Sequence, residues 1–255
     1  MTAPPDFTAR LLVDAGLRPG MRVLDVGCGF GDVTLLAAAL VGEAGAAVGV
    51  DLDGAALERA RGRDVPAGSA VPTFAQAAIA DLPATLDDFD AIVGRRVLMY
   101  QADAVEAVRV LAERLRPGGI IIFQEHDATL TPASLTAFPL HARAQGWLQR
   151  MIEREGADLH IGFHLHAILT RAGLGVEQVR AEAIVQTPTA PYALGAIVRA
   201  CLPRIVAHGV ASAEEVDVDT LQARLDAERT ATDAIYVGDV MFGAGRESRL
   251  FPVER

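Results

Sequence analysis

The sequence predicts an α/β protein with a doubly wound, mainly parallel sheet of about seven strands and with helical insertions. Two observations lead to this fold class. Short apolar runs alternate with helical stretches over the first 130 residues, as expected of strand and helix units that build a parallel sheet. The run Ile120-Ile121-Ile122-Phe123 has no polar alternation, which is typical of a central strand covered by helices on both faces.

The first half of the chain accounts for five strands and three helices. The strands are expected at residues 22–26, 47–51, 73–77, 89–94 and 119–125. The helices are expected at residues 33–41, 55–61 and 103–115. Asp103 is a candidate N-cap for the third helix, and Pro117-Gly118-Gly119 follow it as a stop signal.

After Asp127 the pattern becomes mainly helical. Helices are expected over residues 132–156, 163–172 and 190–230, and strands near 176–185 and at 234–242, the last one antiparallel. We expect a single domain over residues 1–255. The insertions at about 132–172 and 190–230 are expected to form a lid over the substrate, and dimerisation or decoration is the alternative role for them.

Composition excludes several classes of protein. No uncharged apolar run approaches the roughly 18–20 residues of a membrane span, so no membrane partner is expected. The chain has 33 acidic and 23 basic residues, and this net charge of −10 argues against a nucleic-acid partner. Two cysteines make no disulfide framework, residues 1–5 lack a secretion signal, and no CxxC or HExxH motif is present. We therefore expect a cytoplasmic protein without a metal site.

The most informative segment is a glycine loop within residues 23–33. A buried strand that contains Asp25 is followed by Gly27, Gly29 and Gly31 and then by a helix. Glycine allows close approach of a ligand to the backbone, and the helix that follows offers free N–H groups. The loop predicts a nucleotide-like ligand, with tight packing and no ligand as the alternative.

The spacing of the loop separates two kinds of nucleotide ligand. The dinucleotide fingerprint is GxGxxG, whereas this loop reads GxGxG and has Asp32 where the third glycine would stand. This difference disfavours an NAD-dependent oxidoreductase. Asp51 ends the second strand 20 residues after Gly31, where a carboxylate can accept hydrogen bonds from both ribose hydroxyls. The alternative for Asp51 is helix capping.

Together these motifs resemble the class I S-adenosylmethionine-dependent methyltransferases, in the small-molecule branch that includes ubiquinone and menaquinone C-methyltransferases. Residues 23–31 resemble the first motif of that family, and Asp51 resembles its ribose-binding acid. Residues 89–98 are similar to its fourth strand, and 115–119 to the turn before its fifth. The resemblance covers residues 17–127 and returns at 172–174. It implies a Rossmann-like fold and S-adenosylmethionine as cofactor.

The resemblance also implies roles for individual positions. Asp25 would face the methionine amino group, the backbone of Gly27, Cys28 and Gly29 would pass beneath methionine and ribose, and Leu52 would lie against the adenine. The positions expected to hold the cofactor are Asp25, Gly27, Cys28, Gly29, Gly31, Asp51, Leu52, Ala78, Ile79, Asp81, Arg95 and Arg96.

One loop departs from the family pattern. Ala78 stands where the family has an acid that contacts the adenine amine, and Asp81 comes three residues later. Either Asp81 reaches the adenine, or the adenine is held by backbone around Ala78 and Ile79. Arg95 and Arg96 follow the fourth strand and have an alternative role in binding a substrate carboxylate or pairing with surface acids.

The candidate base is His126, which titrates near neutral pH and is expected at the carboxyl edge of the sheet. Methyl transfer is an in-line displacement, so a base is needed only where the acceptor retains a proton. A structural histidine is the alternative. Strand alternation points Glu125 and Asp127 one way and His126 the other. Candidate substrate contacts are Glu125, Asp127, Tyr100, His160 and His164.

The function expected from these residues is methyl transfer to O, N or C of a small-molecule acceptor, in the enzyme class EC 2.1.1.-. Two alternatives remain. The chain either binds the cofactor without transferring its methyl group, as the missing acid at Ala78 would allow, or it is an NAD-dependent oxidoreductase. A homodimer is a possible assembly.

Overall fold

A computed structural model describes residues 7–130 and 132–247 of the chain, which divide into two compact units. Among the described residues, the first unit comprises 7–125, Ile161–Arg180 and 242–247. The second comprises 126–130, 132–160 and Ala181–Met241. The chain therefore passes from one unit to the other four times. Residues 1–5, on which the expectation of no secretion signal rests, lie outside the described residues.

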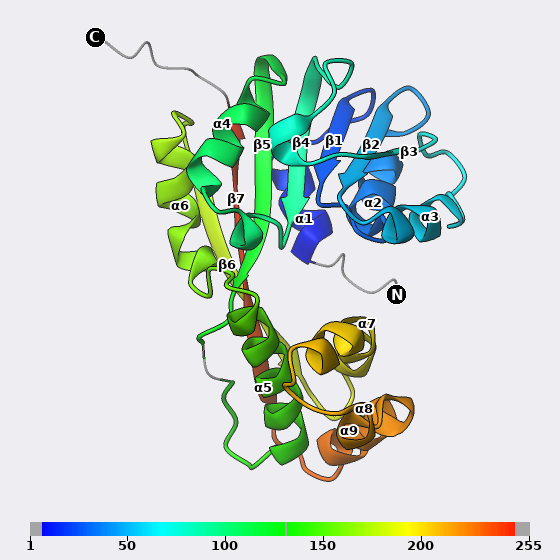
Figure 1. The fold of residues 1–255 in the computed structure, drawn as a ribbon, viewed down its shortest axis with the longest axis vertical. Coiled ribbons are helices and arrows are strands. Elements are labelled where there is room, and N and C mark those ends of the chain that lie inside the picture. The colour runs from blue at the N-terminus through cyan, green and yellow to red at the C-terminus, as the bar shows by residue number, and fades with distance from the viewer. Residues whose placement is uncertain (1–6, 131, 248–255) are drawn as a thin grey trace. The chain divides into compact units, whose positions relative to one another are not determined.

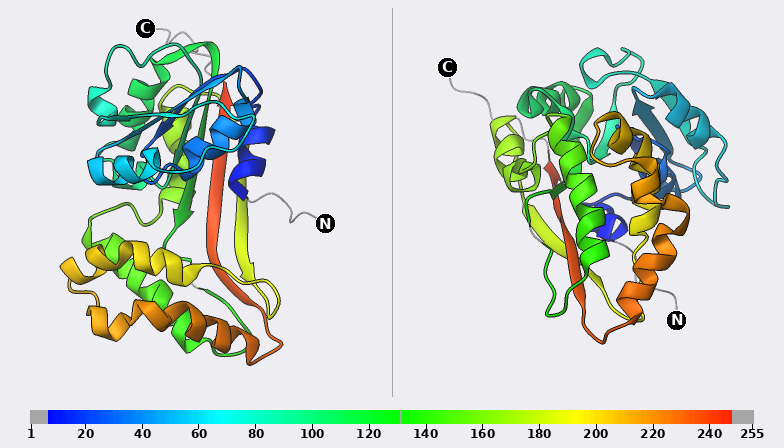
Figure 2. Two further views of the ribbon diagram at one scale, coloured as in Figure 1. Left: turned by 90° about the vertical axis from the view of Figure 1, so that its right-hand side faces the viewer. Right: turned by 60° about the horizontal axis from the view of Figure 1, so that its bottom comes forward.

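A single seven-stranded sheet in the order β3-β2-β1-β4-β5-β7-β6 confirms the predicted fold class (Figure 1). The pairs β1–β2, β2–β3, β1–β4 and β4–β5 are parallel. The last strand, β7, runs antiparallel, as predicted (Figure 2). The strands are β1 (Arg22–Val26), β2 (Ala46–Asp51), β3 (Thr73–Gln76), β4 (Phe89–Arg95), β5 (Leu115–Asp127), β6 (Gln178–Gln186) and β7 (Tyr236–Glu247).

The strand order reverses between β1 and β4, which places a topological switch point at their carboxyl ends. On one face of the sheet, Val23, Val93 and Ile122 pack in a core with Leu12 and Val33 of the helices that cover it. The helices of this unit are α1 (Phe7–Asp14), α2 (Asp32–Val41), α3 (Gly54–Arg61), α4 (Ala104–Ala112) and α6 (Ile161–Arg171), with one-turn 3₁₀ helices at Ile79–Asp81 and Leu98–Tyr100.

Two segments of the first unit differ from the sequence prediction. Sequence analysis did not assign α1, whose Leu11 packs so closely on β7 that a Cβ at Gly243 would lie 2.7 Å from Leu11 Cδ2. Helix α6 begins at Ile161 and not at residue 163 as predicted, so Gly162 lies inside the helix. A Cβ there would lie 2.4 Å from a ring carbon of Phe242, so packing against β7 explains this glycine.

The second unit contains α5 (Pro139–Arg154), α7 (Leu194–Ala207), α8 (Ala213–Val216) and α9 (Val218–Thr230). The predicted helix over 132–156 begins only at Pro139, which stands in the first turn where proline is tolerated. Before it, Ala133 pairs with Val237 in an antiparallel bridge. The predicted insertion 132–172 is divided, because α6 belongs to the first unit. The lid role of the insertions stays a prediction.

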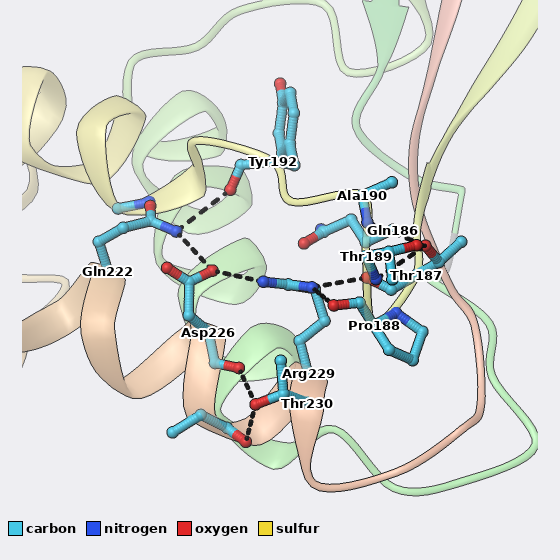
Figure 3. A network of polar contacts seen from close by, with 12 residues as sticks. Gln186, Thr187, Pro188, Thr189, Ala190, Tyr192, Gln222, Asp226, Arg229 and Thr230 are labelled. Carbon is cyan, nitrogen blue, oxygen red and sulfur yellow. Dashed lines mark hydrogen bonds and ion pairs between the residues drawn. The ribbon is translucent and has the colours of Figure 1, made fainter.

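The described part of the second unit is held by buried polar contacts. Arg229, 7% exposed, donates to the carbonyl oxygens of Thr187 (2.7 Å) and Pro188 and pairs with Asp226 at 3.2 Å (Figure 3). Gln222 donates to the carbonyl of Tyr192 at 3.3 Å. These contacts tie α9 to the turn after β6, which offers backbone acceptors that no helix or strand satisfies.

Within the described ranges, no helix combines the length and the apolar character that crossing a membrane requires.

Candidate functional site

The glycine loop lies between the carboxyl end of β1 and the first turn of α2, at the switch point of the sheet. Gly27, Gly29 and Gly31 have φ values of 64°, 52° and 79°, in the left-handed region that favours glycine. A Cβ at Gly27 would also lie 2.6 Å from Val97 Cγ2, whereas a Cβ at Gly29 would meet no atom within 4 Å. Gly27 is therefore required by packing, and the side of the loop at Gly29 is open.

Asp51 connects this loop to the turn after β2. Its carboxylate accepts hydrogen bonds from the backbone N–H of Gly29 at 2.7 Å and of Asp53 at 2.9 Å. Asp53 in turn caps α3 by accepting from the N–H groups of Ala55 and Ala56. Each oxygen of Asp51 retains acceptor capacity, because a carboxylate oxygen has more than one lone-pair site. The geometry suits a vicinal diol held beside Gly29.

Asp25 is buried at 1% exposure beneath the loop, where Thr34 Oγ1 donates to its Oδ2 at 2.6 Å. Burial raises the pKa of Asp25 to about 7, although the Thr34 hydrogen bond and the charge of Arg95 act in the opposite direction. The neighbouring carboxylate of Asp51 adds to the rise. At neutral pH this buried acid is thus poised to ionise beside a cation.

Cys28 contributes backbone rather than a reactive side chain. Its N–H donates to the carbonyl of Val50 at 3.0 Å, and its carbonyl accepts from Gly31 at 2.9 Å. Burial raises the pKa of the Cys28 thiol, and the carboxylates of Asp25 and Asp51 raise it further. The side chain stays a thiol at neutral pH, which suits its predicted role as part of a ligand-binding backbone.

The two segments predicted to hold an adenine ring carry little side-chain polarity. Leu52 is 69% exposed beside Asp51, and Gln76 fixes its backbone by donating to the Leu52 carbonyl at 2.8 Å. Ala78 precedes a 3₁₀ turn in which Ile79 is buried and Asp81 is exposed. The N–H of Asp81 donates to the carbonyl of Ala78 at 3.1 Å. The adenine roles of these residues stay predictions.

Arg95 ends β4 and Arg96 follows it, and both are engaged within the first unit. Arg95 pairs with Asp32 at the start of α2 at 3.4 Å and lies within hydrogen-bond distance of Thr8. This pairing favours the alternative of an ion pair with a nearby acid. Arg96 has a φ of 58°, a value that residues other than glycine rarely adopt, and its N–H donates to the carbonyl of Gln124 at 2.9 Å.

The three polar residues that end β5 are all buried. Glu125 is fully buried, and its Oε1 accepts from the N–H groups of Val97 and Leu98 at 3.0 and 2.8 Å. Asp127 Oδ1 accepts from the N–H groups of Thr129 and Leu130 and from the Thr129 hydroxyl. These contacts are made with protein groups, and the substrate roles of both acids stay predictions. His126 is 6% exposed, and its role as base stays a prediction.

The remaining candidates lie in different parts of the chain. Tyr100 is 43% exposed at the end of the 3₁₀ turn after β4, and His164 is exposed on α6. His160 Nδ1 lies 3.2 Å from Thr129 Oγ1 and 3.6 Å from Asp127 Oδ2. Over residues 7–130 and 132–247, no three side chains of the metal-binding types gather where they could hold an ion.

No sequence pattern indicated a polar cluster around His141 in the second unit. His141, 1% exposed, contacts Glu228 at 2.7 Å through Nδ1 and Gln186 at 3.2 Å through Nε2. Glu228 also accepts from the N–H groups of Leu140 and His141 and so caps α5. Because these residues are far apart in the sequence, no spacing pattern could have revealed the cluster.

Curated proteins with similar sequences include methyltransferases. Two curated relatives are a ubiquinone/menaquinone biosynthesis C-methyltransferase, UbiE, of Vibrio vulnificus (strain YJ016) and a demethylmenaquinone methyltransferase of Staphylococcus aureus (strain MRSA252). The first is 35% identical over 46% of this chain and 45% of its own length. The second is 28% identical over 52% of this chain and 54% of its own length. The chain thus spans about half the length of the curated relatives it matches.

Solved structures share the fold. A structure described as a putative methyltransferase from Bacillus halodurans has a TM-score of 0.58 at 14% identity and covers 94% of this chain and 98% of its own. A phosphoethanolamine N-methyltransferase 2 from Haemonchus contortus, solved with phosphomonomethylethanolamine and S-adenosylhomocysteine, has a TM-score of 0.55 at 16% identity. It covers 93% of this chain and 51% of its own.

A family model described as a methyltransferase domain matches residues 17–173, which include the glycine loop, Asp51 and the turn after β4. The match extends over more than half of the chain. The protein is therefore a member of the methyltransferase domain family, with a fold similar to that of class I S-adenosylmethionine-dependent enzymes.

Proposed function

We propose that this protein is an S-adenosylmethionine-dependent methyltransferase (EC 2.1.1.-) that acts on a small-molecule acceptor. The observation that carries the proposal is the carboxylate of Asp51, which is fixed by the N–H groups of Gly29 and Asp53 beside the open side of the glycine loop. A carboxylate in that position is suited to the two ribose hydroxyls of the cofactor. The family match supports the same ligand.

The chain's own residues fit the three parts of the cofactor. Asp25, once ionised, would pair with the methionine ammonium group, and the buried setting strengthens that attraction. The backbone at Gly27 and Cys28 would pass beneath the ligand. Leu52 offers an exposed apolar surface to the adenine ring. When bound, the cofactor supplies a methyl group on a positively charged sulfur.

Methyl transfer requires an acceptor atom in line with the methyl–sulfur bond, so the protein acts mainly by positioning. The acceptor atom forms a bond to the methyl carbon while the carbon–sulfur bond breaks and its electrons return to sulfur. His126 is the proposed base for an acceptor that carries a proton. A His126→Ala variant should then lower kcat about a hundredfold with little change in cofactor affinity. An unchanged kcat would assign the proton transfer elsewhere.

Calorimetry tests cofactor choice directly. We expect S-adenosylmethionine and S-adenosylhomocysteine to bind and NAD to give no signal. NAD binding without a response to the methyl donor would instead support the oxidoreductase alternative. The Asp51→Ala variant serves as the control for site-specific binding.

A turnover assay distinguishes an enzyme from a cofactor-binding protein. A panel of acceptors should include quinols, because the curated relatives are named for quinone methylation. Formation of S-adenosylhomocysteine with one acceptor supports the enzyme. Tight cofactor binding without product across the panel supports the alternative of a protein that binds the cofactor without transfer.

The helices of residues 190–230 and 132–160 are our candidates for acceptor specificity. They form much of the second unit, whose buried polar contacts give it a defined interior. A cytoplasmic location, a homodimer and the lack of a nucleic-acid partner are further predictions. Light scattering in solution would test the homodimer, and a gel-shift assay at low salt would test nucleic-acid binding.

A further inference from the structure

Glu125 is a fully buried carboxylate at the end of β5, within the first unit. Removing a charge from water is costly unless hydrogen bonds stabilise it. Its Oε1 accepts from two successive N–H groups, those of Val97 at 3.0 Å and Leu98 at 2.8 Å. Both hydrogen bonds end on the same carboxyl oxygen of Glu125. The arrangement therefore holds the chain segment that follows β4.

That segment turns sharply as it leaves the sheet. Arg96 adopts a φ of 58°, and its N–H donates to the carbonyl of Gln124. Gln124 and Glu125, two neighbouring residues of β5, thus accept hydrogen bonds from the N–H groups of residues 96, 97 and 98. Residues other than glycine rarely adopt this backbone conformation, and it persists only where the surrounding structure fixes it. Glu125 supplies two of these three contacts.

The held segment reaches the glycine loop through one side chain. Val97 packs over Gly27 so closely that a Cβ at Gly27 would lie 2.6 Å from Val97 Cγ2. The same valine packs against Gly94 at the end of β4, where a Cβ would lie 2.9 Å from Val97 Cγ1. Any movement of Val97 therefore changes the space available to the turn at Gly27.

We propose that Glu125 is a positioning residue for the cofactor loop. It fixes Val97 through two backbone hydrogen bonds, and Val97 sets the position of the Gly27 turn. This role replaces the predicted contact between Glu125 and the acceptor, and it rests on the proposed function of the glycine loop. Glu125 acts on the cofactor only through other residues.

The test compares two buried carboxylates in the same sheet. Glu125→Ala removes the acceptor of Val97 and Leu98. Asp90→Ala is the matched control, because Asp90 is 6% exposed, lies near the amino end of β4, and accepts from the N–H of Arg22 at 2.6 Å and pairs with Arg116. Both variants should lose thermal stability. Glu125→Gln, which keeps an oxygen acceptor, should recover most of the wild-type behaviour.

Calorimetry with S-adenosylhomocysteine gives the decisive readout. We expect Glu125→Ala to raise the Kd roughly tenfold, Asp90→Ala to leave it within about twofold, and Glu125→Gln to stay near wild type. Equal Kd values for Glu125→Ala and wild type would overturn the positioning role while leaving the proposed function intact. Equal weakening by Asp90→Ala would also overturn it. Absence of binding by the wild-type protein would instead reject the proposed function.

A second variant covers the case in which Glu125→Ala does not fold. Val97→Ala keeps the backbone N–H donor to Glu125 and removes the side chain that packs over Gly27. We expect it to weaken S-adenosylhomocysteine binding several-fold, since the turn at Gly27 would lose its packing partner. An unchanged Kd for a folded Val97→Ala protein would contradict the route from Glu125 to the glycine loop.

Discussion

Each of the two units contains a carboxyl group with a shifted pKa, and the two shifts are opposite in direction. Beneath the glycine loop, burial raises the pKa of Asp25 to about 7, and its hydrogen bond from Thr34 does not offset this effect. In the second unit, burial also acts to raise the pKa of Glu228. Hydrogen bonds from His141 and from two backbone N–H groups prevail, so that pKa is lowered.

This contrast separates the acid that we propose to bind the cofactor from an acid whose partners lie within the protein. Glu228 has its partners within the protein and links α9 to α5. Asp25 is left with a cost of ionisation that a cationic ligand would relieve. A strongly perturbed buried acid beside an open loop is a mark of a functional site. Four substitutions test the contrast.

The largest effect is expected from Asp25→Asn through the pH dependence of stability. Because the pKa of Asp25 is raised, its stabilising contribution is fully present below about pH 4 and is lost as the pH rises through about 7. Relative to the wild type, Asp25→Asn should gain stability by roughly 3 to 4 kcal/mol between pH 4 and pH 8. Urea unfolding across that range measures the gain, and parallel curves for the two proteins would contradict the raised pKa.

His141→Ala should destabilise the second unit. The substitution removes a buried partner of Glu228 and Gln186, and we expect the free energy of unfolding to fall by about 3 kcal/mol. Binding of S-adenosylhomocysteine by the folded protein should persist. His208→Ala is the control, because His208 is 36% exposed and should change stability by less than about 0.5 kcal/mol. Loss of binding with unchanged stability would assign His141 a functional role.

In contrast to His141→Ala, Asp51→Ala should weaken cofactor binding and have a smaller effect on the free energy of unfolding. Loss of the ribose contacts and of the bond that holds Gly29 should raise the Kd for S-adenosylhomocysteine about a hundredfold. Asp103→Ala, which removes the side-chain cap of α4, is a matched carboxylate control expected to affect only stability. Calorimetry on both variants checks the prediction, and similar Kd values for the two variants would contradict the proposed role of Asp51 in cofactor binding.

Gly29→Ala should have the smallest effect on stability. Its φ of 52° disfavours a side chain, but a Cβ would meet no atom within 4 Å, so we expect a loss of about 1 kcal/mol. Gly27→Ala should cost more, since Val97 occupies the space of its Cβ. Thermal unfolding of the two variants compares backbone strain alone, in Gly29→Ala, with backbone strain and steric overlap with Val97, in Gly27→Ala. An equal loss would show that the packing of Val97 is adaptable.

Local signals explain what the sequence could predict. The strand, glycines and helix of residues 23–33 are contiguous, so their geometry follows from short-range preferences, and the predicted bounds of β1 are matched. The packing of Gly162 against Phe242 and the hydrogen bond from Val97 to Glu125 could not be predicted, because the partners are distant in sequence. The helices of the second unit were predicted, but its side-chain contacts were not, because His141 and Glu228 come together only in the folded chain.

The four passages of the chain between the units have a consequence for biosynthesis. The sheet unit needs residues 161–180, which follow the first segment of the second unit, and residues 242–247, which are made only after all of the second unit. Strands β1 to β5 must therefore wait with one edge uncovered until β7 emerges and takes its place beside β5. Unpaired strand edges favour association between chains. We therefore expect nascent chains to need a chaperone most in the interval before β7 has been synthesised.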